Sequence, residues 1–261
     1  MSPDLLLTGG TGTLGRLIFP RLQDAGRKVR VLSRSRHESG DGVEYVTGDL
    51  ATGDGLERAV DGISTVVHCA GTAKGDEDKT RNLVQAASAA GVQHLVYISV
   101  VGVERIPVVS RTDRAMFGYF ASKLAAEKVI AGSGLPWTTL RATQFHEAML
   151  AMIQQMARLP VVPAPSGFQF QPVDGAEVAD RLVELSLGEP AGLVPDLAGP
   201  RVYKMAEMVR TYLRASHRRR LVLPVKAPGK AARAYRSGAN LAPDRAVGRR
   251  TWEKFLDERL D

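Results

Sequence analysis

Short apolar segments alternate with segments of helical periodicity over the first 160 residues of the chain. The strand-like runs are residues 4–7, 29–32, 43–46, 64–68, 94–99 and 137–140. Apolar residues recur at helical spacing in residues 14–22, 56–60, 76–90 and 120–131. Strands that alternate with helices predict an α/β fold, in which a doubly wound parallel sheet is covered by helices on both faces.

The pattern loosens beyond residue 145. The segments expected there are a methionine-rich helix at 148–159, a proline-bearing loop at 161–165, helices at 173–187 and 204–214, strands at 193–197 and 221–225, and further helices to the end. We expect residues 1–147 to form the main domain and residues 148–261 a smaller α/β part, interleaved with the core and folded against the strand ends, where open α/β sheets bind substrates. Residues 100–118 are expected to form a mobile loop.

Composition restricts the class of protein without naming a function. The 261 residues are 44% hydrophobic and 24% charged, as in soluble globular proteins. No apolar run approaches the length of a membrane span, and the N-terminus enters a strand instead of a signal peptide. The single cysteine, Cys69, excludes an internal disulfide. We therefore expect a cytoplasmic protein with no membrane partner and no metal site.

Positive charge is concentrated in the last quarter of the chain. Residues 201–261 carry a net charge of +10, whereas the first 200 residues carry −3. Such a segment could attract nucleic acid, an anionic membrane or an anionic substrate. Solvated faces are the preferred interpretation, and nucleic acid is not expected, because no zinc pattern or aromatic-interleaved basic stripe accompanies the charge.

A glycine-rich turn between the first strand and the first helix carries the main functional signal. Gly10, Gly12 and Gly15 form G-x-G-x-x-G, and Gly9, Gly12 and Gly15 form a wider G-x-x-G-x-x-G. In this context the glycines permit a tight turn, a close approach of a pyrophosphate and close packing of helix on strand. The motif predicts a Rossmann-type dinucleotide site. The residues expected to contact the cofactor there are Gly9, Thr11, Gly12, Thr13, Leu14, Gly15 and Arg16.

The end of the second strand indicates which dinucleotide binds. An NAD site places Asp or Glu there to bind the ribose 2′-hydroxyl. Here the strand ends in Ser33-Arg34-Ser35-Arg36, with no acidic residue before Glu38. Arginine suits a 2′-phosphate through charge-assisted hydrogen bonds. We predict NADP(H), with Ser33 and Arg34 as contacts and Arg16 as a second clamp.

Tyr119 and Lys123 form a Tyr-x-x-x-Lys pair in a predicted helix. A spacing of four residues places both side chains on one helical face, where an ammonium group lowers the pKa of a phenol. Tyr119 would then donate a proton to a carbonyl that receives a hydride. Ser99, at the carboxyl end of the fifth strand, would hydrogen-bond the substrate oxygen. The alternatives are a surface tyrosine beside a surface lysine, and a serine that merely ends a strand.

Together these segments resemble the atypical short-chain dehydrogenase/reductases of the NmrA-like, NAD(P)H-binding kind. The segments that carry the resemblance are 8–16, 48–50, 68–71, 90–99, 119–123 and 140–145. The resemblance implies that Asp49 accepts from the adenine amino group with Leu50 beside the ring, and that Ala70 and Gly71 lie against the cofactor ribose. It also implies that Lys123 binds the nicotinamide ribose and that Thr143 to Phe145 line the nicotinamide end. Cys69 is then a small residue near the cofactor, not a nucleophile.

The predicted function is an NADPH-dependent oxidoreductase that reduces a carbonyl, quinone or related small molecule. Many NmrA-like proteins lack the catalytic tyrosine and act as redox sensors, so the alternative is a non-catalytic NADP(H)-sensing regulator. Epimerase chemistry on a sugar nucleotide uses the same tyrosine and lysine, but such enzymes usually carry a larger substrate domain. Met149, Met152 and Met156 are interpreted as core, and His146 as an ordinary residue at a helix start.

Overall fold

The computed structural model describes residues 3–40, 42–71 and 75–260. The chain forms two compact units that are interleaved in the sequence. The first comprises Met1–Ser99, Ala121–Leu140 and Ala176–Val194, and the second comprises Val100–Phe120, Arg141–Gly175 and Pro195–Asp261. The units therefore do not divide at one position such as residue 147.

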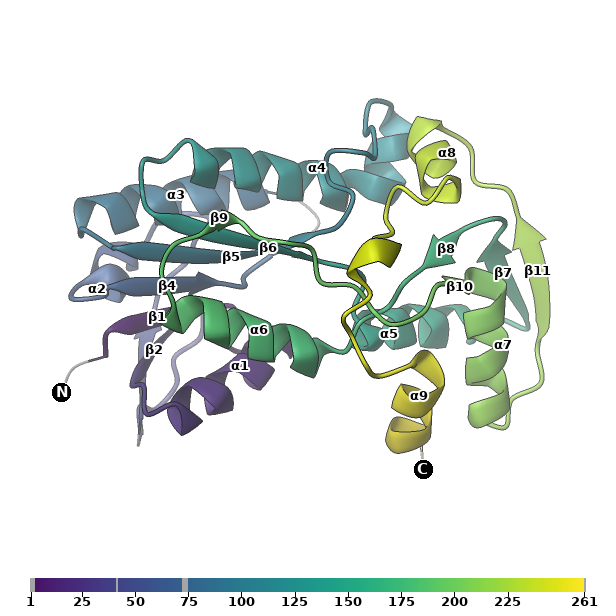
Figure 1. The fold of residues 1–261 in the computed structure, drawn as a ribbon, viewed down its shortest axis with the longest axis horizontal. Helices are drawn as coiled ribbons and strands as arrows, with labels where there is room; N and C mark the ends of the chain where they lie inside the picture. The colour runs from purple at the N-terminus through teal and green to yellow at the C-terminus, as the bar shows by residue number, and fades with distance from the viewer. Residues whose placement is uncertain (1–2, 41, 72–74, 261) are drawn as a thin grey trace. The chain divides into compact units, whose positions relative to one another are not determined.

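A seven-stranded sheet is the main feature of the structure (Figure 1). Its strands, in spatial order, are β3 (Val43–Thr47), β2 (Val29–Ser33), β1 (Leu5–Thr8), β4 (Thr65–His68), β5 (His94–Val100), β6 (Trp137–Ala142) and β9 (Gly192–Leu193). The paired strands run parallel, as in Leu5 opposite Val29 and Leu5 opposite Thr65. The strand order reverses after β3, so the sheet is doubly wound on both sides of β1. This confirms the predicted Rossmann-type α/β fold.

Burial on both faces explains why the strands appear as continuous apolar runs in the sequence. Every residue of β1, β2, β4 and β5 is buried, whereas β3 at the edge is only half-buried. The helices α1 (Thr13–Asp24) and α6 (Gly175–Leu187) cover one face, and α3 (Asp76–Ala89) and α4 (Arg111–Ala131) cover the other (Figure 1). A short helix, α2 (Leu56–Val60), packs against α3. A parallel sheet requires this double cover.

Helix α4 begins nine residues earlier than the sequence analysis predicted, and the expected loop at 100–118 is wrong in its second half. The start at Arg111 is stabilised by a reciprocal cap. Asp113 N donates to Ser110 Oγ (3.0 Å), and Ser110 N and Oγ donate to Asp113 Oδ2 (3.1 and 2.8 Å). Asp113 also accepts from Ala231 N (3.2 Å), so this helix start is anchored within the second unit. Tyr119 consequently lies inside a helix, not at the end of a loop.

The second unit combines short helices with two small sheets. Its remaining helices are α5 (His146–Met156), α7 (Met205–Ala215), α8 (Lys230–Arg236) and α9 (Trp252–Leu260), with a 3-10 turn at Pro243–Arg245. Strands β8 (Gln169–Phe170) and β10 (Tyr203–Lys204) pair antiparallel. Aromatic rings form part of its core, with Tyr235 in contact with Phe117, Phe168 and Phe170.

Residues 161–165, predicted as a loop, form a strand. This strand, β7 (Val161–Pro165), pairs in parallel with β11 (Leu221–Val225), with Val161 opposite Leu221. Each of the two strands has one paired side, and a proline without an N–H is tolerated at the other side. The strand predicted at 193–197 is shorter than expected, since β9 ends at Leu193. Of the three methionines assigned to the core, Met149 is buried and Met152 is exposed.

Candidate functional site

The glycine turn between β1 and α1 has the backbone geometry that the sequence motif requires. Gly9 has φ +72°, and a Cβ placed there would lie 2.7 Å from Ala70 N. Gly12 N donates to Gly9 O (2.9 Å), which closes the turn, and Arg16 N donates to Gly12 O (3.0 Å), which begins the helix. A Cβ on Gly15 would overlap the backbone of Gly9 and Gly10. Any residue larger than glycine at position 9 or 15 would therefore place its Cβ against neighbouring backbone atoms.

A cleft of about 460 Å³ opens beside this turn. We call it the glycine cleft; its lining residues are Gly9, Thr11, Gly12, Leu32, Ser33, Arg34, Gly48, Asp49, Leu50, Ala51, Cys69, Ala70, Gly71 and Lys79. All of them belong to the first unit, at the carboxyl ends of β1 to β4. Unpaired N–H groups at a helix N-terminus and a glycine-lined concave surface fit a nucleotide with its phosphates.

The sequence analysis anticipated most of these lining residues. Gly9, Thr11, Gly12, Ser33, Arg34, Asp49, Leu50, Ala70 and Gly71 lie in the cleft wall. Thr13 and Leu14 lie in the first turn of α1, where Thr13 is exposed and Leu14 is buried. Arg16 is exposed and donates from Nε to Thr11 O (2.9 Å), so its guanidinium is held beside the turn.

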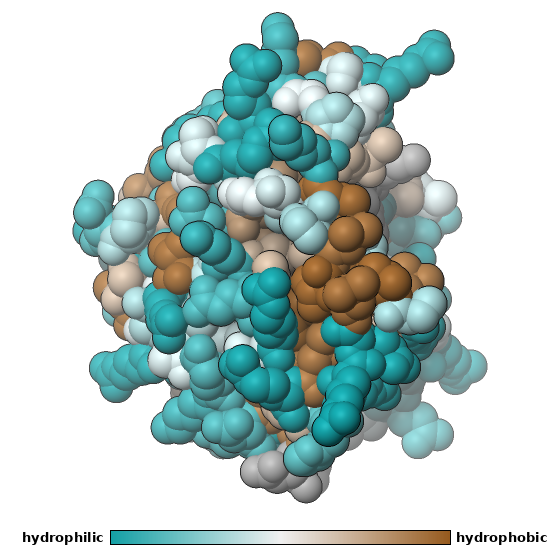
Figure 2. Space-filling model, turned by 90° about the vertical axis from the view of Figure 1, so that its right-hand side faces the viewer, coloured by the Kyte–Doolittle hydropathy of each residue, from teal (hydrophilic) through white to brown (hydrophobic). Residues whose placement is uncertain are grey.

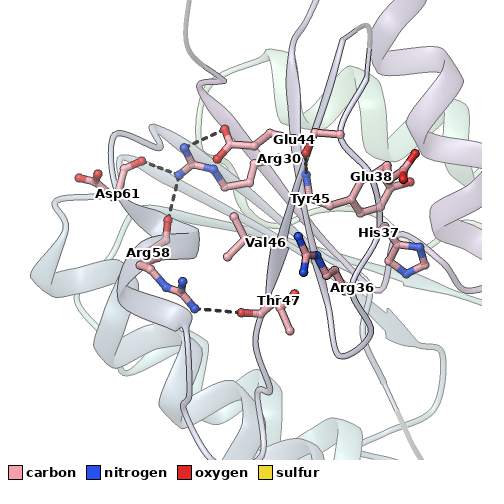
Figure 3. Close-up of a pocket in the computed structure, with 11 residues that line it drawn as sticks. Arg30, Arg36, His37, Glu38, Glu44, Tyr45, Val46, Thr47, Arg58 and Asp61 are labelled. Atoms are coloured by element: carbon pink, nitrogen blue, oxygen red, sulfur yellow. Dashed lines mark hydrogen bonds and ion pairs between the residues drawn. The ribbon is translucent and has the colours of Figure 1, made fainter.

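The two arginines after β2 line different pockets. Arg34 lines the glycine cleft, whereas Arg36 lines a second pocket of about 810 Å³ at the outer side of β3 (Figure 3). We call this the outer pocket. Glu38, the first acidic residue after β2, also lines the outer pocket. Among the residues that the structure describes, the cleft wall beside Ser33 therefore presents an arginine and no carboxylate from the β2 end.

The outer pocket is held together by Arg30. Its guanidinium donates to Glu44 Oε2 (3.1 Å) and to the carbonyl oxygens of Arg58 (3.1 Å) and Asp61 (2.6 Å) (Figure 3). These bonds join β2, β3 and the end of α2. Arg30 therefore has a structural role.

Asn82, a residue on α3 that the sequence analysis missed, holds the loop after β3 through hydrogen bonds. Asn82 Nδ2 donates to the carbonyl oxygens of Leu50 (2.8 Å) and Ala51 (3.2 Å). Asp49 Oδ1 accepts from Ala51 N (2.8 Å), which fixes the carboxylate in a local turn. Only the tertiary fold brings Asn82 to this loop, and its place on α3 gives no signal in the sequence.

Lys123 is buried and held by three groups of the first unit. Its Nζ donates to Ile98 O (3.2 Å), lies 3.6 Å from Asp76 Oδ2 and stands 4.7 Å above the centre of the Tyr97 ring. Burial lowers the pKa of the ammonium group, and the Asp76 carboxylate opposes this shift. Asp76, itself 2% exposed, was not identified from the sequence. Its acidic side chain at a helix start has an ordinary explanation, since helix N-termini favour acids.

Ser99 is buried near the end of β5, where the sequence analysis placed it. Its Oγ has no hydrogen-bond partner among the described residues. A buried hydroxyl normally finds a partner, so an unsatisfied one at the carboxyl end of a central strand is a candidate ligand contact.

Tyr119 lies on α4 in the second unit and is 39% exposed. Its ring packs edge-on against Phe120, with centroids 6.1 Å apart. The structure thus places Tyr119 four residues before Lys123 on one continuous helix, with an accessible ring.

The segment 143–146, which follows β6, contains two side chains whose polar atoms have no hydrogen-bond partner among the described residues, Gln144 and His146. Thr143 is buried, and its Oγ1 accepts from Gly199 N (3.3 Å). The amide of Gln144 has no partner for either polar atom among the described residues. His146 is fully buried, and burial lowers its pKa to about 4. The Gln144 amide therefore has free hydrogen-bonding capacity, and the Thr143 hydroxyl can still donate one bond.

His68, next to the cleft-lining Cys69, and Cys69 itself are both held uncharged by burial. His68 shares hydrogen bonds with Thr8 Oγ1 (2.7 Å) and Thr80 Oγ1 (3.3 Å), and burial together with the Lys123 charge lowers its pKa to about 3. Burial raises the pKa of the Cys69 thiol to about 12. A thiol that stays protonated is a poor nucleophile, in agreement with the role expected for Cys69.

Comparison with known proteins agrees with this geometry. A family model described as NAD(P)H-binding matches residues 9–185. The chain is 32% identical over 169 residues to a (4-alkanoyl-5-oxo-2,5-dihydrofuran-3-yl)methyl phosphate reductase of Streptomyces griseus, covering 62% of this chain and 55% of the relative. It is 28% identical over 234 residues to the photosystem II assembly factor Ycf39 of Synechocystis, covering 81% and 67%.

The fold also resembles solved structures. A quinone oxidoreductase of Escherichia coli complexed with NADPH superposes with a TM-score of 0.82 at 17% identity, covering 98% of this chain and 100% of the other. At this identity the likeness shows the fold alone. The chain spans about half the length of several curated relatives that it matches.

Proposed function

The chain belongs to the NAD(P)H-binding family, and from this premise we propose that it is an NADPH-dependent reductase of a quinone, a carbonyl compound or a similar conjugated small molecule. The observation that carries the proposal is the wall of the glycine cleft. Arg34 and Ser33 lie where an NAD site would hold a carboxylate, and Glu38 faces the outer pocket instead.

The cofactor half of the site is assigned as follows. The turn from Gly9 to Gly15 binds the pyrophosphate, and Arg34 binds the 2′-phosphate, with Arg16 held beside the turn as a second cation. Asp49 and Leu50 form the adenine end, while Ala70 and Gly71 leave room for the ribose. Lys123 hydrogen-bonds the nicotinamide ribose. Bound NADPH supplies the hydride.

The catalytic half uses three side chains. Lys123 shares one face of α4 with Tyr119, and its positive charge stabilises the phenolate that forms when Tyr119 gives up its proton. Tyr119 donates its proton to the substrate oxygen as the adjacent carbon is reduced. Ser99 Oγ, unsatisfied in the protein, donates a hydrogen bond to the same oxygen. Gln144, whose amide has no partner among the described residues, is a further proposed ligand contact after β6, beside Thr143, whose hydroxyl accepts from Gly199 N and can still donate.

The choice of cofactor is tested by titrating the protein with NADPH and NADH while following protein or nicotinamide fluorescence. We expect Arg34→Gln to weaken NADPH binding by about 1.5–3 kcal/mol, or roughly 10–100-fold, while NADH binding changes little. Arg36→Gln is the matched control, because it removes the same charge from the outer pocket. Tighter binding of NADH than NADPH by the wild type, or equal losses in both variants, would refute the assignment.

A second function, sensing of NADP(H) without catalysis, is favoured by two observations. Tyr119 is 39% exposed. One relative is an assembly factor and not a named reductase. The two functions differ in turnover: a sensor binds NADPH with the same dependence on Arg34 but does not oxidise it in the presence of any acceptor.

A further inference from the structure

The small sheet formed by β7 and β11 exposes an apolar face. Residues at alternate positions of a strand share a face, and the register places Leu221 beside Val161, Leu223 beside Pro163 and Val225 beside Pro165. Leu221 is 66% exposed, Leu223 49% and Val225 39%. The opposite face of β7 is buried through Val162 and Ala164. We call the exposed side the β7–β11 face.

This pattern differs from the usual one in its exposed side. An antiparallel or edge sheet that meets solvent on one side normally alternates apolar inward and polar outward residues. Here both sets are apolar. Leu159, just before β7, adds a further exposed leucine. Figure 2, which faces the side where Figure 1 draws β7 and β11, shows a continuous hydrophobic area. Contiguous patches of this kind mark interaction surfaces.

Cations flank β11 at both ends, and the neighbouring stretches of the sequence contain no carboxylate. Arg218, Arg219 and Arg220 directly precede β11, Lys226 directly follows it, and all four are exposed. Residues 208–243 contain nine Lys or Arg and no Asp or Glu. Residues 148–173, which include β7, contain no acidic residue either. The surface therefore combines an apolar centre with a positive border.

We propose that the β7–β11 face binds the surface of a bilayer that contains anionic phospholipids. The leucine and valine side chains enter the boundary between headgroups and acyl chains, and the arginines and Lys226 remain among the phosphates. No spanning segment is needed. Among the helices within residues 3–40, 42–71 and 75–260, none is long and apolar enough to cross a membrane. The sequence analysis expected no membrane partner, because no apolar run approaches a membrane span and the basic residues were interpreted as solvated faces.

Charge argues against a second copy as the occupant. Two copies that met through β11 would bring both Arg218–Arg220 triplets to one interface, where like charges repel. Pro224 also removes an N–H from β11, which disfavours the addition of another strand along its edge. An anionic surface satisfies the border charges and covers the apolar centre at the same time.

The test is co-sedimentation of the full chain with vesicles of phosphatidylcholine alone and of phosphatidylcholine with phosphatidylglycerol in a three-to-one ratio. We expect binding to the anionic vesicles only, with strong loss at roughly 0.5 M salt because of screening. Changing Arg218, Arg219 and Arg220 to Gln removes three cations worth about fivefold each, so binding falls roughly 100-fold. Leu221→Ser with Leu223→Ser lowers it at least about tenfold with the charge unchanged.

Matched controls come from the first unit. Leu187→Ser with Leu193→Ser removes two leucines of similar exposure, and Lys28, Arg81 and Lys128 changed to Gln remove three exposed cations. Both control variants bind vesicles as the wild type does, and all variants keep the thermal midpoint and NADPH affinity. Equal losses in control and patch variants, equal binding to neutral vesicles, or no binding at low salt would overturn the proposal. So would a dimer in light scattering that Leu221→Ser with Leu223→Ser dissociates.

Discussion

Replacement of Asp76 by Asn tests whether the Asp76–Lys123 pair is a buried charge pair that holds the lysine for catalysis. Both side chains are at most 3% exposed, with Nζ and Oδ2 3.6 Å apart. Loss of one partner of a buried pair costs about 3–5 kcal/mol, because the remaining charge is uncompensated. Lys123 can escape this cost only by giving up its proton. At about pH 7, deprotonation of Lys123 costs a similar free energy, roughly 1.4 kcal/mol for each pH unit between the solution pH and an unfolded pKa of about 10.4.

We therefore expect Asp76→Asn to lower the free energy of unfolding by about 3–5 kcal/mol near neutral pH. The direction in which the stability of the variant changes with pH follows from the pKa of Lys123. Burial lowers the pKa of Lys123 in the folded protein, and loss of Asp76 lowers it further. Below about pH 10.4 the unfolded chain then binds a proton that the folded variant does not, so the stability of the variant rises with pH. The difference from the wild type narrows as the pH is raised from about 7 towards 10.

Urea unfolding followed by far-UV circular dichroism at several pH values measures both quantities. Asp180→Asn is the matched control, since it breaks the Arg21–Asp180 pair (2.5 Å), in which Asp180 is 65% exposed. Exposed pairs contribute about 0–1 kcal/mol, so this control changes stability little and without the same pH dependence. An Asp76→Asn cost below about 1 kcal/mol, or one that stays constant between neutral and alkaline pH, would refute the reasoning.

Three further predictions concern the glycine cleft and the residues behind it. Gly15→Ala forces a Cβ onto the backbone of Gly9 and Gly10, so it should lower the unfolding free energy by about 1–3 kcal/mol and abolish tight NADPH binding. The control Gly188→Ala, whose Cβ meets nothing closer than 3.5 Å, should have neither effect. Equal urea midpoints for the two variants would contradict this prediction. Asn82→Ala removes the two hydrogen bonds to the loop after β3, at Leu50 and Ala51, and should lower the unfolding free energy by about 1–2 kcal/mol. NADPH affinity in a titration should fall several-fold, and an unchanged affinity would show that other contacts hold the loop. His68 has its pKa lowered from 6.5 to about 3, so the unfolded chain alone takes up a proton as the pH falls from about 6.5 to 3, and the wild type should lose up to about 5 kcal/mol over that range. His68→Asn should show a shallower acid dependence of the thermal midpoint, and an identical slope would exclude His68 as its source.

Local signals in the sequence predicted the parts of the fold where they were strong. The run of Leu5, Leu6 and Leu7 before a glycine turn predicted β1 and the start of α1 because a doubly covered parallel strand needs continuous apolar residues. The arginine at position 34 was predicted to face the cofactor, and it lines the glycine cleft. The glycine turn acts through its backbone geometry, and Arg34 acts through its position at the end of β2. Both properties depend on a short segment of the chain, so the sequence alone can predict them.

Other parts of the fold depended on signals that were weak or misleading. Pro163 and Pro165 suggested a loop, yet β7 needs only one paired side and tolerates both prolines. The early start of α4 does have a local signal, the Ser110-x-x-Asp113 capping box, which was outweighed by the charged residues that follow it.

The partners of the candidate site were the hardest to predict. Asp76 meets Lys123 from a helix more than forty residues earlier in the sequence, and Asn82 meets the loop after β3 from the same helix. Neither contact has a sequence pattern, because each is created by packing. Gln144 was included only within the segment 143–145, and the structure distinguishes it by a buried amide that has no partner among the described residues.

Turnover of NADPH with a panel of quinones tests the central claim most directly, measured as the fall in nicotinamide absorbance for the wild type, Tyr119→Phe and Tyr45→Phe. The account predicts that the wild type oxidises NADPH with at least one quinone, that Tyr119→Phe lowers kcat by about 100-fold or more, and that the control Tyr45→Phe does not. Unchanged NADPH affinity in Tyr119→Phe would assign the loss to proton transfer. Absence of turnover in the wild type, or equal kcat in Tyr119→Phe, would contradict the proposed reductase mechanism.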